Sequence, residues 1–400
     1  MTAMDHSMAT SNFVKSERLS KLPPYLFAEI DKKKKAALAA GRDIINLGVG
    51  DPDRPTPSAI VKSLQKHVEN PAFHQYALDQ GAPELRASIA AFCKRRYGLD
   101  LDPNSEILPL IGSKEGLAHF PIAVLNPGDV SLVPNPCYPV YRSASMFAGA
   151  EVFTLPLESK RGFRPDLDAI PSDVLSRAKL LFLNYPNNPT GAVADIEFYR
   201  HVVARAQRSG FIVAQDAAYN EMYYEGATPP PSILQVPGAK DVAVEFHSLS
   251  KTFNMTGWRV GFAIGGAPMI AALAQVKSNT DSGIFTAIQH AAVTALDHYD
   301  ELTTPIRTLY QTRRDAFTAA LHKIGWTGVV APDATFYMWI PCPAGISSTE
   351  LCGRLLDEAN VVTTPGIGFG NHAEGYIRAA LTVETPRLLE AVERIGRLRI

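Results

Sequence analysis

An alternation of helical segments with short apolar runs extends from residue 57 to residue 288, and it constrains the fold more than any other feature of the chain. Apolar runs bounded by turn residues are typical of buried strands. A parallel pair of strands needs a crossover connection, usually a helix, between its members. The alternation therefore predicts an α/β fold with a mostly parallel sheet and helices on both faces. The expected strands are residues 130–133, 151–155, 180–183, 211–215, 242–246 and 260–264.

The pattern changes after this region. One long helix is expected at residues 302–320, with Arg307, Arg313 and Arg314 on its polar side, and it leads into a smaller α+β domain. A chain of 400 residues is too long for one simple core and suits two domains. The expected domains are a large one at residues 57–290 and a small one at residues 291–400.

Charge and composition exclude several classes of protein. With 39 basic and 40 acidic side chains the formal charge is −1, which argues against a nucleic-acid or membrane-surface partner. No apolar stretch reaches the roughly 18 residues that span a bilayer, and residues 1–15 lack the pattern of a secretory signal. The cysteines show no zinc-binding spacing, so we expect no metal and buried thiols in a reducing cytoplasm. They are Cys93, Cys137, Cys342 and Cys352.

Lys251 is the first candidate for chemistry. It follows the apolar run at residues 242–246 and stands among Ser248, Ser250 and Arg259. A single lysine is usually a solvated surface charge. Here the lysine offers an amine that can form a Schiff base, and its neighbours offer donors for a phosphate dianion. Together they predict a site for pyridoxal 5'-phosphate (PLP).

Asp216 supplies a second element of such a site. The pyridine nitrogen of PLP must stay protonated for the ring to accept electrons, so a carboxylate is needed at the end of another strand. Asp216 closes the apolar run at residues 211–215, and Tyr219 follows at a distance that can bring its phenol to the 3'-oxygen of the cofactor. Asp216 alone would more simply cap the next helix. Beside Lys251 the cofactor interpretation is favoured.

Three weaker signals point the same way. Asn188 lies in a turn after the expected strand at residues 180–183, where an amide could meet a ligand. Residues 110–116 predict a glycine turn into a helix whose N-terminal amides can hold a phosphate. Tyr138 could stack on the pyridine ring, although core packing is the favoured explanation when it is taken alone.

With these segments in place, the chain resembles the fold-type I PLP-dependent aminotransferases of class I/II, and most closely the LL-diaminopimelate aminotransferases. The resemblance covers residues 21–378. The general likeness rests on six residues in the order and spacing of the family, namely Asn188, Asp216, Tyr219, Lys251, Arg259 and Arg378. The narrower likeness rests on longer phrases at residues 111–116, 245–251, 279–285 and 363–370.

The resemblance implies a role for each cofactor residue. Lys251 carries the cofactor and is the catalytic residue, Asp216 binds the ring nitrogen, and Tyr138 stacks on the ring. Asn188 and Tyr219 hold the 3'-oxygen. The residues implied around the phosphate are Ser113, Lys114, Ser248, Ser250 and Arg259.

The resemblance also implies substrate contacts and an assembly. Arg378 would bind the α-carboxylate of the substrate, a task suited to the guanidinium fork. Tyr76 would reach the phosphate of the neighbouring subunit, which implies a homodimer with shared active sites. Residues 77–81 form a stretch in which family members vary in the residues that face the distal end of the substrate, so the contacts to the distal ammonium and carboxylate stay open. The other positions that match the substrate site are Tyr25, Gly50, Lys114, Tyr138 and Asn188.

Two further regions are assigned by the same likeness. Residues 21–56 are expected to pack on the small domain, after a flexible N-terminus at residues 1–20. The implied reaction is ping-pong transfer of an amino group from LL-diaminopimelate to 2-oxoglutarate, giving tetrahydrodipicolinate and glutamate, for lysine and cell-wall synthesis. An aminotransferase for alanine, aspartate or aromatic amino acids would share every cofactor residue. A PLP-binding regulator or a β-lyase on the same fold is a third possibility.

Overall fold

A computed structural model describes residues 14–22 and 26–398. Its largest sheet has seven strands in the order β2-β8-β7-β6-β5-β3-β4. All pairings from β7 through to β4 are parallel, whereas β8 is antiparallel to both β7 and β2. The predicted α/β fold and mostly parallel sheet are confirmed. The strands are β2 (Ile107–Leu110), β3 (Val130–Asn135), β4 (Glu151–Pro156), β5 (Ala178–Asn184), β6 (Ile212–Asp216), β7 (Ala243–Ser248) and β8 (Gly261–Gly265).

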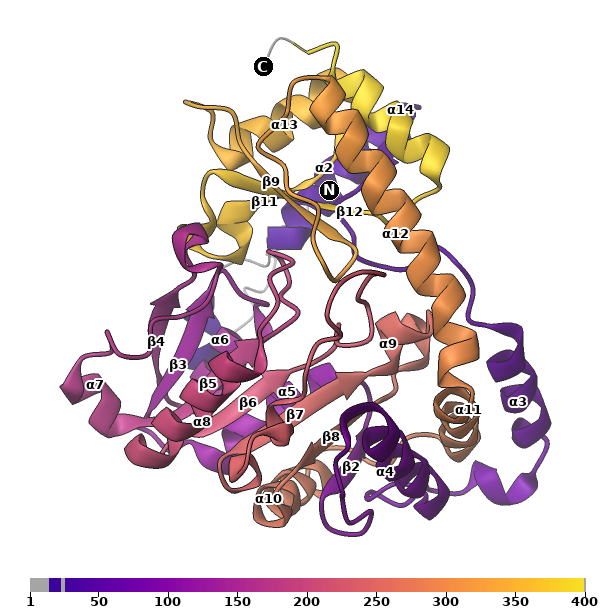
Figure 1. Cartoon of the computed structure of the whole chain (residues 1–400), viewed down its shortest axis with the longest axis vertical. Helices are drawn as coiled ribbons and strands as arrows, with labels where there is room; N and C mark the ends of the chain where they lie inside the picture. Colours follow the sequence, from indigo (N-terminus) through magenta and orange to yellow (C-terminus); the bar gives the residue numbers. More distant parts are fainter. Residues whose placement is uncertain (1–13, 23–25, 399–400) are drawn as a thin grey trace, which may run out of the picture.

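Helices cover both faces of this sheet, as Figure 1 shows. Successive strand residues point to opposite faces, and β5 illustrates this: Leu180 and Phe182 pack into one core, whereas Leu181 and Leu183 pack into another. The first core contains α5, α6 and α10, and the second contains α4, α8 and α11. The helices of this part are α3 (Ser58–Val68), α4 (Pro83–Tyr97), α5 (Ser113–Val124), α6 (Val140–Phe147), α7 (Ser172–Arg177), α8 (Ile196–Ser209), α9 (Leu249–Thr252), α10 (Ala267–Ser278) and α11 (Thr286–Asp297).

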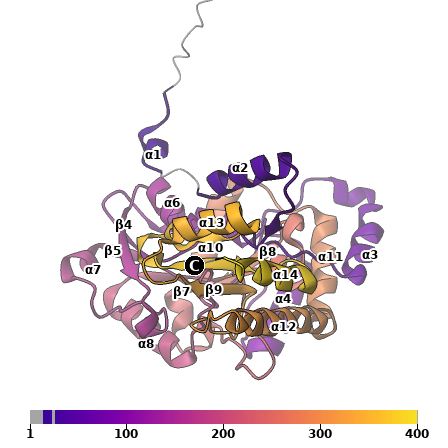
Figure 2. The ribbon, with the colours of Figure 1, turned by 90° about the horizontal axis from the view of Figure 1, so that it is seen from above.

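A separate antiparallel sheet lies in the C-terminal part of the chain, with strand order β11-β12-β9. Helix α12 runs from the large sheet alongside this small sheet (Figure 1), and in the view of Figure 2 α12 and α13 lie on opposite sides of β9. The elements are α12 (Tyr299–Lys323), β9 (Tyr337–Pro341), α13 (Ser348–Ala359), β10 (Val361–Val362), β11 (Thr364–Pro365), β12 (Tyr376–Ala380) and α14 (Thr385–Ile395).

The N-terminal segment joins this C-terminal part. After α1 (Glu17–Ser20) and α2 (Leu26–Ala39), strand β1 (Ile45–Asn46) pairs in parallel with β10. The guanidinium of Arg42 donates to Oδ1 of Asn360 at 2.7 Å. These contacts attach the described part of residues 21–56 to the C-terminal part of the chain. The predicted domain boundaries at residues 20, 56 and 290 stay predictions.

Two local features differ from what the sequence indicates. Strand β2 was not among the expected strands, because its four residues are followed at once by the glycine turn that dominates the local pattern. Arg313 was expected on the polar side of its helix, which is wrong. Its side chain is fully buried and forms two hydrogen bonds, of 2.6 and 2.7 Å, to the carboxylate of Asp53. A distant carboxylate thus brings a helix arginine into the interior.

No helix among the described residues is long and apolar enough to cross a membrane.

Candidate active site

Several strands of the large sheet end at one edge, beside a pocket of about 420 Å³. Strands β2, β5, β6 and β7 run in one direction and end at this edge, and β8 begins there. Open α/β sheets bind ligands at this edge. Arg378, on the small sheet, also lines the pocket. The other predicted site residues that line it are Gly50, Ser113, Lys114, Tyr138, Asn188, Asp216, Tyr219, Ser248, Ser250, Lys251 and Arg259.

Lys251 lies on α9, directly after β7, and its amine points to the N-terminal segment. Nζ donates a hydrogen bond to the carbonyl of Gly50 at 2.8 Å. Burial lowers the pKa of the amine to about 8; Asp51 opposes this shift, and Arg378 and Arg259 add to it. A lysine with a pKa near 8 can both give and accept a proton close to neutral pH.

Asp216 ends β6 and faces the same pocket. Its Oδ2 accepts a hydrogen bond from the phenol of Tyr141 at 2.6 Å, and Oδ1 accepts one from the backbone amide of Ala218 at 3.2 Å. Burial raises the pKa of Asp216 to about 6, although Tyr141, Ala218 and His247 each act to lower it. A cationic ring nitrogen placed against this carboxylate would favour its ionised form.

The anion-binding end of the pocket is made by three chain segments in close approach. Gly112, with φ of +77°, precedes α5, and a Cβ on it would lie 2.4 Å from Nη2 of Arg259. A Cβ on Gly261 would lie 2.8 Å from the backbone nitrogen of Ser113 and 2.5 Å from the carbonyl oxygen of His247. Only glycine permits this approach. It brings the first turn of α5, the strand end at Ser248 and a guanidinium together, which is a donor set suited to a phosphate.

Arg378 supplies the remaining charged group. Its Nη1 donates to Oδ1 of Asn188 and its Nη2 to the carbonyl of Gly48, both at 2.8 Å. The Nε atom is buried and finds no hydrogen-bond partner among the described residues. The guanidinium also lies over the ring of Tyr337, 4.2 Å from its centroid. A rigid guanidinium with an unused donor suits a carboxylate ligand.

Comparison with known proteins decides the family. Residues 42–395 match the model of aminotransferase class I and II. The chain belongs to the class I and II aminotransferases. It is 54% identical over 385 residues to the LL-diaminopimelate aminotransferase of Aquifex aeolicus, covering 96% of this chain and 99% of that one. The enzyme of the same name from Syntrophobacter fumaroxidans is 55% identical over 386 residues, with the same coverage.

A solved structure agrees with this assignment. The substrate-bound structure of BacF from Bacillus subtilis superimposes with a TM-score of 0.92 at 40% identity, covering 96% of this chain and 98% of that one. The family depends on PLP, so the chain is a PLP-dependent aminotransferase, and the predicted enzyme class is confirmed. The pocket's donor set, described above, fits that cofactor.

Three residues that bind predicted site residues were not themselves predicted from the sequence. Tyr141 binds Asp216, Asn184 donates from Nδ2 to the backbone carbonyl of Asp216 at 2.9 Å, and Tyr337 shares a hydrogen bond of 2.9 Å with the phenol of Tyr219. Tyr141 and Tyr337 stand in aromatic and apolar surroundings that are typical of core packing. Asn184 ends β5 and directly precedes the turn that contains Asn188, so that turn was its available signal.

Two predicted residues lie apart from the pocket lining. Tyr76 is 96% exposed and does not line the pocket of its own chain. Its role in a neighbouring subunit stays a prediction, and such a role would require an exposed side chain. Tyr25 lies outside the described residues, so its assignment to the substrate site also stays a prediction.

Proposed function

We propose that this aminotransferase transfers an amino group from LL-diaminopimelate to 2-oxoglutarate, giving tetrahydrodipicolinate and glutamate. The identity of 54% over nearly the whole length of a relative with that activity in its name carries the proposal. The reaction would serve lysine and cell-wall synthesis in the cytoplasm. We expect no nucleic-acid or membrane partner, in keeping with the formal charge of −1.

The pocket suggests how PLP would be held. Lys251 would bind it covalently, Asp216 would face its ring nitrogen, and Tyr138 would stack on the ring. Asn188 accepts from Arg378 through Oδ1, so its Nδ2 is the group left to donate to the 3'-oxygen, beside Tyr219. The phosphate would lie in the anion-binding end, among Ser113, Lys114, Ser248, Ser250 and Arg259.

The residues then divide the work of the reaction. When bound, PLP supplies a ring that disperses the electron pair left on the substrate after its α-proton is removed. Lys251 Nζ takes that proton and later returns one, since its pKa lies near neutral pH. Asp216 holds a proton at the ring nitrogen. Arg378 binds the α-carboxylate and orients the Cα–H bond toward Lys251.

Selection of the substrate depends on its distal end. LL-diaminopimelate carries an ammonium and a carboxylate there, whereas glutamate carries only a carboxylate. We assign these contacts to Tyr25, Gly50, Lys114 and the loop at residues 76–81. Of these, Lys114 is a charged residue in the pocket lining. A buried polar group left without a partner costs about 1–3 kcal/mol, so donors that lack the distal ammonium should react poorly.

An assay across amino donors tests the proposal. With 2-oxoglutarate as acceptor, LL-diaminopimelate should give glutamate rapidly, while alanine, aspartate and phenylalanine should give little. Rapid turnover of one of these three with none of LL-diaminopimelate would move the function to an aminotransferase of ordinary amino acids. Bound PLP with no transfer from any donor would instead favour a regulator or a β-lyase.

A further inference from the structure

A buried lysine outside the pocket joins two parts of the structure. Lys277 lies in the last turn of α10, and its side chain is only 1% exposed. Nζ donates to Oε1 of Glu115 at 3.0 Å, to Oδ1 of Asp281 at 2.8 Å and to the carbonyl of Ser282 at 3.0 Å. All three hydrogens of the ammonium thus have a partner. None of these residues takes part in the mechanism above.

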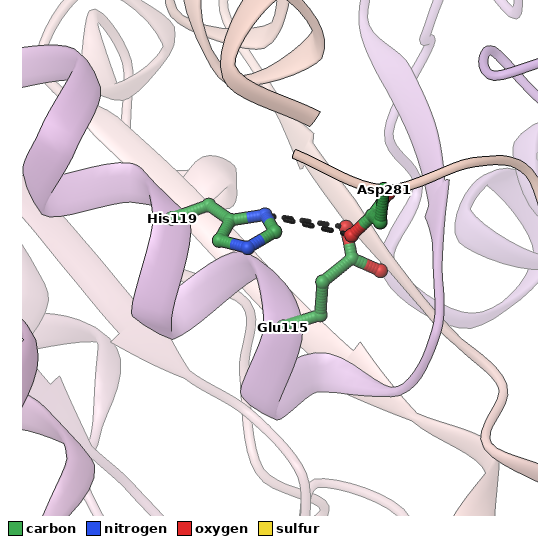
Figure 3. A group of neighbouring side chains, drawn as sticks. All are labelled: Glu115, His119 and Asp281. Carbon is green, nitrogen blue, oxygen red and sulfur yellow. Dashed lines mark ion pairs between the residues drawn. The ribbon is translucent and has the colours of Figure 1, made fainter. Parts of the chain in front are cut away.

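Figure 3 shows Glu115, His119 and Asp281 pointing toward one another. Such a group could hold a metal ion, but the ammonium of Lys277 already binds both carboxylates. His119 Nδ1 lies 3.6 Å from Oε1 of Glu115 and 3.8 Å from Oδ2 of Asp281. The cluster therefore carries its own cation. The role of the cluster therefore depends on the chain segments that Glu115 and Asp281 connect to it.

Glu115 connects the cluster to the anion-binding end of the pocket. While Oε1 accepts from Lys277, Oε2 accepts from the backbone amide of Ile111 at 2.5 Å. Glu115 is the third residue of α5, so this contact closes the turn that contains Gly112 and Ser113. The glycine turn and the first turn of α5 are therefore held from behind by a carboxylate that Lys277 fixes in place.

Asp281 and Ser282 connect the cluster to the segment that carries Tyr76. The next residue, Gly283, is in close contact with that segment: a Cβ on it would lie 2.4 Å from the carbonyl of Leu78 and 3.0 Å from that of Ala77. Further along, Gln289 donates to the carbonyl of Ile284 at 2.7 Å and accepts from the amide of Ala82 at 2.6 Å. Residues 77–82 are thus supported by the loop that Lys277 holds.

We propose that Lys277 is a positioning residue for phosphate binding, which it serves in two places. Through Glu115 it holds the phosphate-binding turn of its own chain. Through Asp281 and Ser282 it holds the support beneath Tyr76, which meets the phosphate of the neighbouring subunit. The inference rests on the proposed function, which supplies the phosphate contact of the α5 turn, and on the predicted role of Tyr76 across the subunit boundary. One ammonium thereby positions part of the phosphate site of its own chain and part of the phosphate site of the neighbouring subunit.

The test compares two ligands that differ only in the phosphate. Full-length protein freed of cofactor is titrated with PLP and with pyridoxal by absorbance, as wild type and as Lys277→Met. Loss of a charged hydrogen-bond network should weaken PLP binding at least about 10-fold and leave pyridoxal binding within about 2-fold. The matched control is Lys240→Met, which removes an ammonium bound to Glu106 and to the carbonyl of Asp100, outside the pocket. It should keep the wild-type preference for PLP.

The outcomes separate this inference from the proposed function. Wild type without preference for PLP over pyridoxal would contradict the proposed phosphate site itself. Wild-type preference retained in folded Lys277→Met would overturn the role of Lys277 alone. A loss in Lys240→Met equal to that in Lys277→Met would show general destabilisation and would also overturn it. If Lys277→Met does not fold, Glu115→Gln and Asp281→Asn, which keep side-chain shape, carry the same test.

Tyr76 provides a second readout. In wild type, Tyr76→Phe should weaken PLP binding by removing the phenol that meets the phosphate. In Asp281→Asn the same change should add little, because Tyr76 has already lost its support. In Glu115→Gln it should add its full effect, because that variant disturbs only the other phosphate contact. Full additivity of Tyr76→Phe with Asp281→Asn would overturn the second half of the proposal.

Discussion

The phenol of Tyr141 donates a hydrogen bond to Oδ2 of Asp216 across 2.6 Å, and both groups are buried. The same tyrosine stacks on Phe182, with 4.8 Å between ring centroids, and meets Tyr138 edge-on at 6.0 Å. Tyr141 thus touches the two residues assigned to the ring of PLP. Its phenol lowers the pKa of Asp216 against the effect of burial.

Tyr141→Phe should weaken PLP binding without disturbing the fold. Loss of the phenol raises the pKa of Asp216 further, so less of the carboxylate is ionised near neutral pH. A hydrogen bond to a charged group contributes about 1.5–3 kcal/mol, so affinity should fall about 10-fold or more, and more at pH 6 than at pH 8. Absorbance titration across pH measures this. Tyr185→Phe, which removes a phenol bound to the backbone of Phe163, is the matched control.

Lys251→Ala should abolish the covalent attachment of PLP and almost all transfer. Removal of a general base alone costs about 10²–10⁴ in rate, and here the same amine also carries the cofactor. Borohydride treatment followed by peptide mapping should label Lys251 in wild type and leave the variant unlabelled. Label found at Lys114, the other lysine in the pocket lining, would contradict the assignment.

Asp216→Asn should change how the stability of the cofactor-free protein depends on pH. Burial raises the pKa of Asp216 from 3.8 to about 6, so its contribution to stability is full below pH 3.8 and is lost as pH rises through 6. The amide of the variant does not titrate, so the stability of the variant does not fall over this pH range. Near pH 7 it should therefore gain up to about 3 kcal/mol relative to wild type, less the value of the altered hydrogen bonds. Thermal unfolding of both proteins from pH 4 to pH 8 measures the difference in stability between them. A difference that stayed constant over this range would contradict the prediction.

Arg378→Ala should impair both half-reactions, because donor and acceptor share the α-carboxylate contact. The apparent KM of LL-diaminopimelate and that of 2-oxoglutarate should rise together, by about 10-fold or more for a lost charged hydrogen bond. Arg378→Lys should rescue little, since an ammonium cannot reproduce the guanidinium fork. A rise confined to one substrate would show that the two bind their carboxylates at different places.

Mixed dimers should show whether Tyr76 acts across the subunit boundary. We expect a homodimer by light scattering, and we expect Tyr76→Ala and Lys251→Ala to be weakly active when each is expressed alone. A dimer with one copy of each variant contains one site with an intact lysine and an intact Tyr76 from the other chain. Coexpression should therefore restore activity, whereas a tyrosine acting within its own chain would restore none.

The site residues that could be predicted share one property. Lys251 and Asp216 each follow an apolar run at the end of a strand, where a charge is unexpected and therefore informative. Tyr141 and Tyr337 lie within aromatic and apolar surroundings, so core packing is the simplest interpretation of their sequence. Their partners Asp216 and Tyr219 are 75 and 118 residues away. Only the fold brings such residues together.

Buried lysine and arginine side chains could not be predicted from the sequence for a related reason. A lysine or an arginine on a helix is normally solvated, which is why Arg313 was placed on the polar side of α12 and Lys277 was not noticed. Asp53, the partner of Arg313, is 260 residues away, and Glu115, one partner of Lys277, is 162 residues away. Asp281, the other carboxylate partner of Lys277, is only four residues along the chain. By contrast, the parallel sheet was predictable because each of its expected strands is a short apolar run, which can be recognised from a few neighbouring residues.

The contact between Lys251 and Gly50 is invisible to conventional mutagenesis. The acceptor is a main-chain carbonyl, so exchanging the side chain cannot delete it. Every larger residue at position 50 fails first for another reason, since a Cβ there would lie 1.9 Å from the phenolic oxygen of Tyr337. A scan of all substitutions at position 50 would show that larger residues are not tolerated, and it would not reveal the hydrogen bond to the amine of Lys251. Only an alteration of the main chain, such as an ester in place of the amide that links residues 50 and 51, would weaken that acceptor and loosen the lysine.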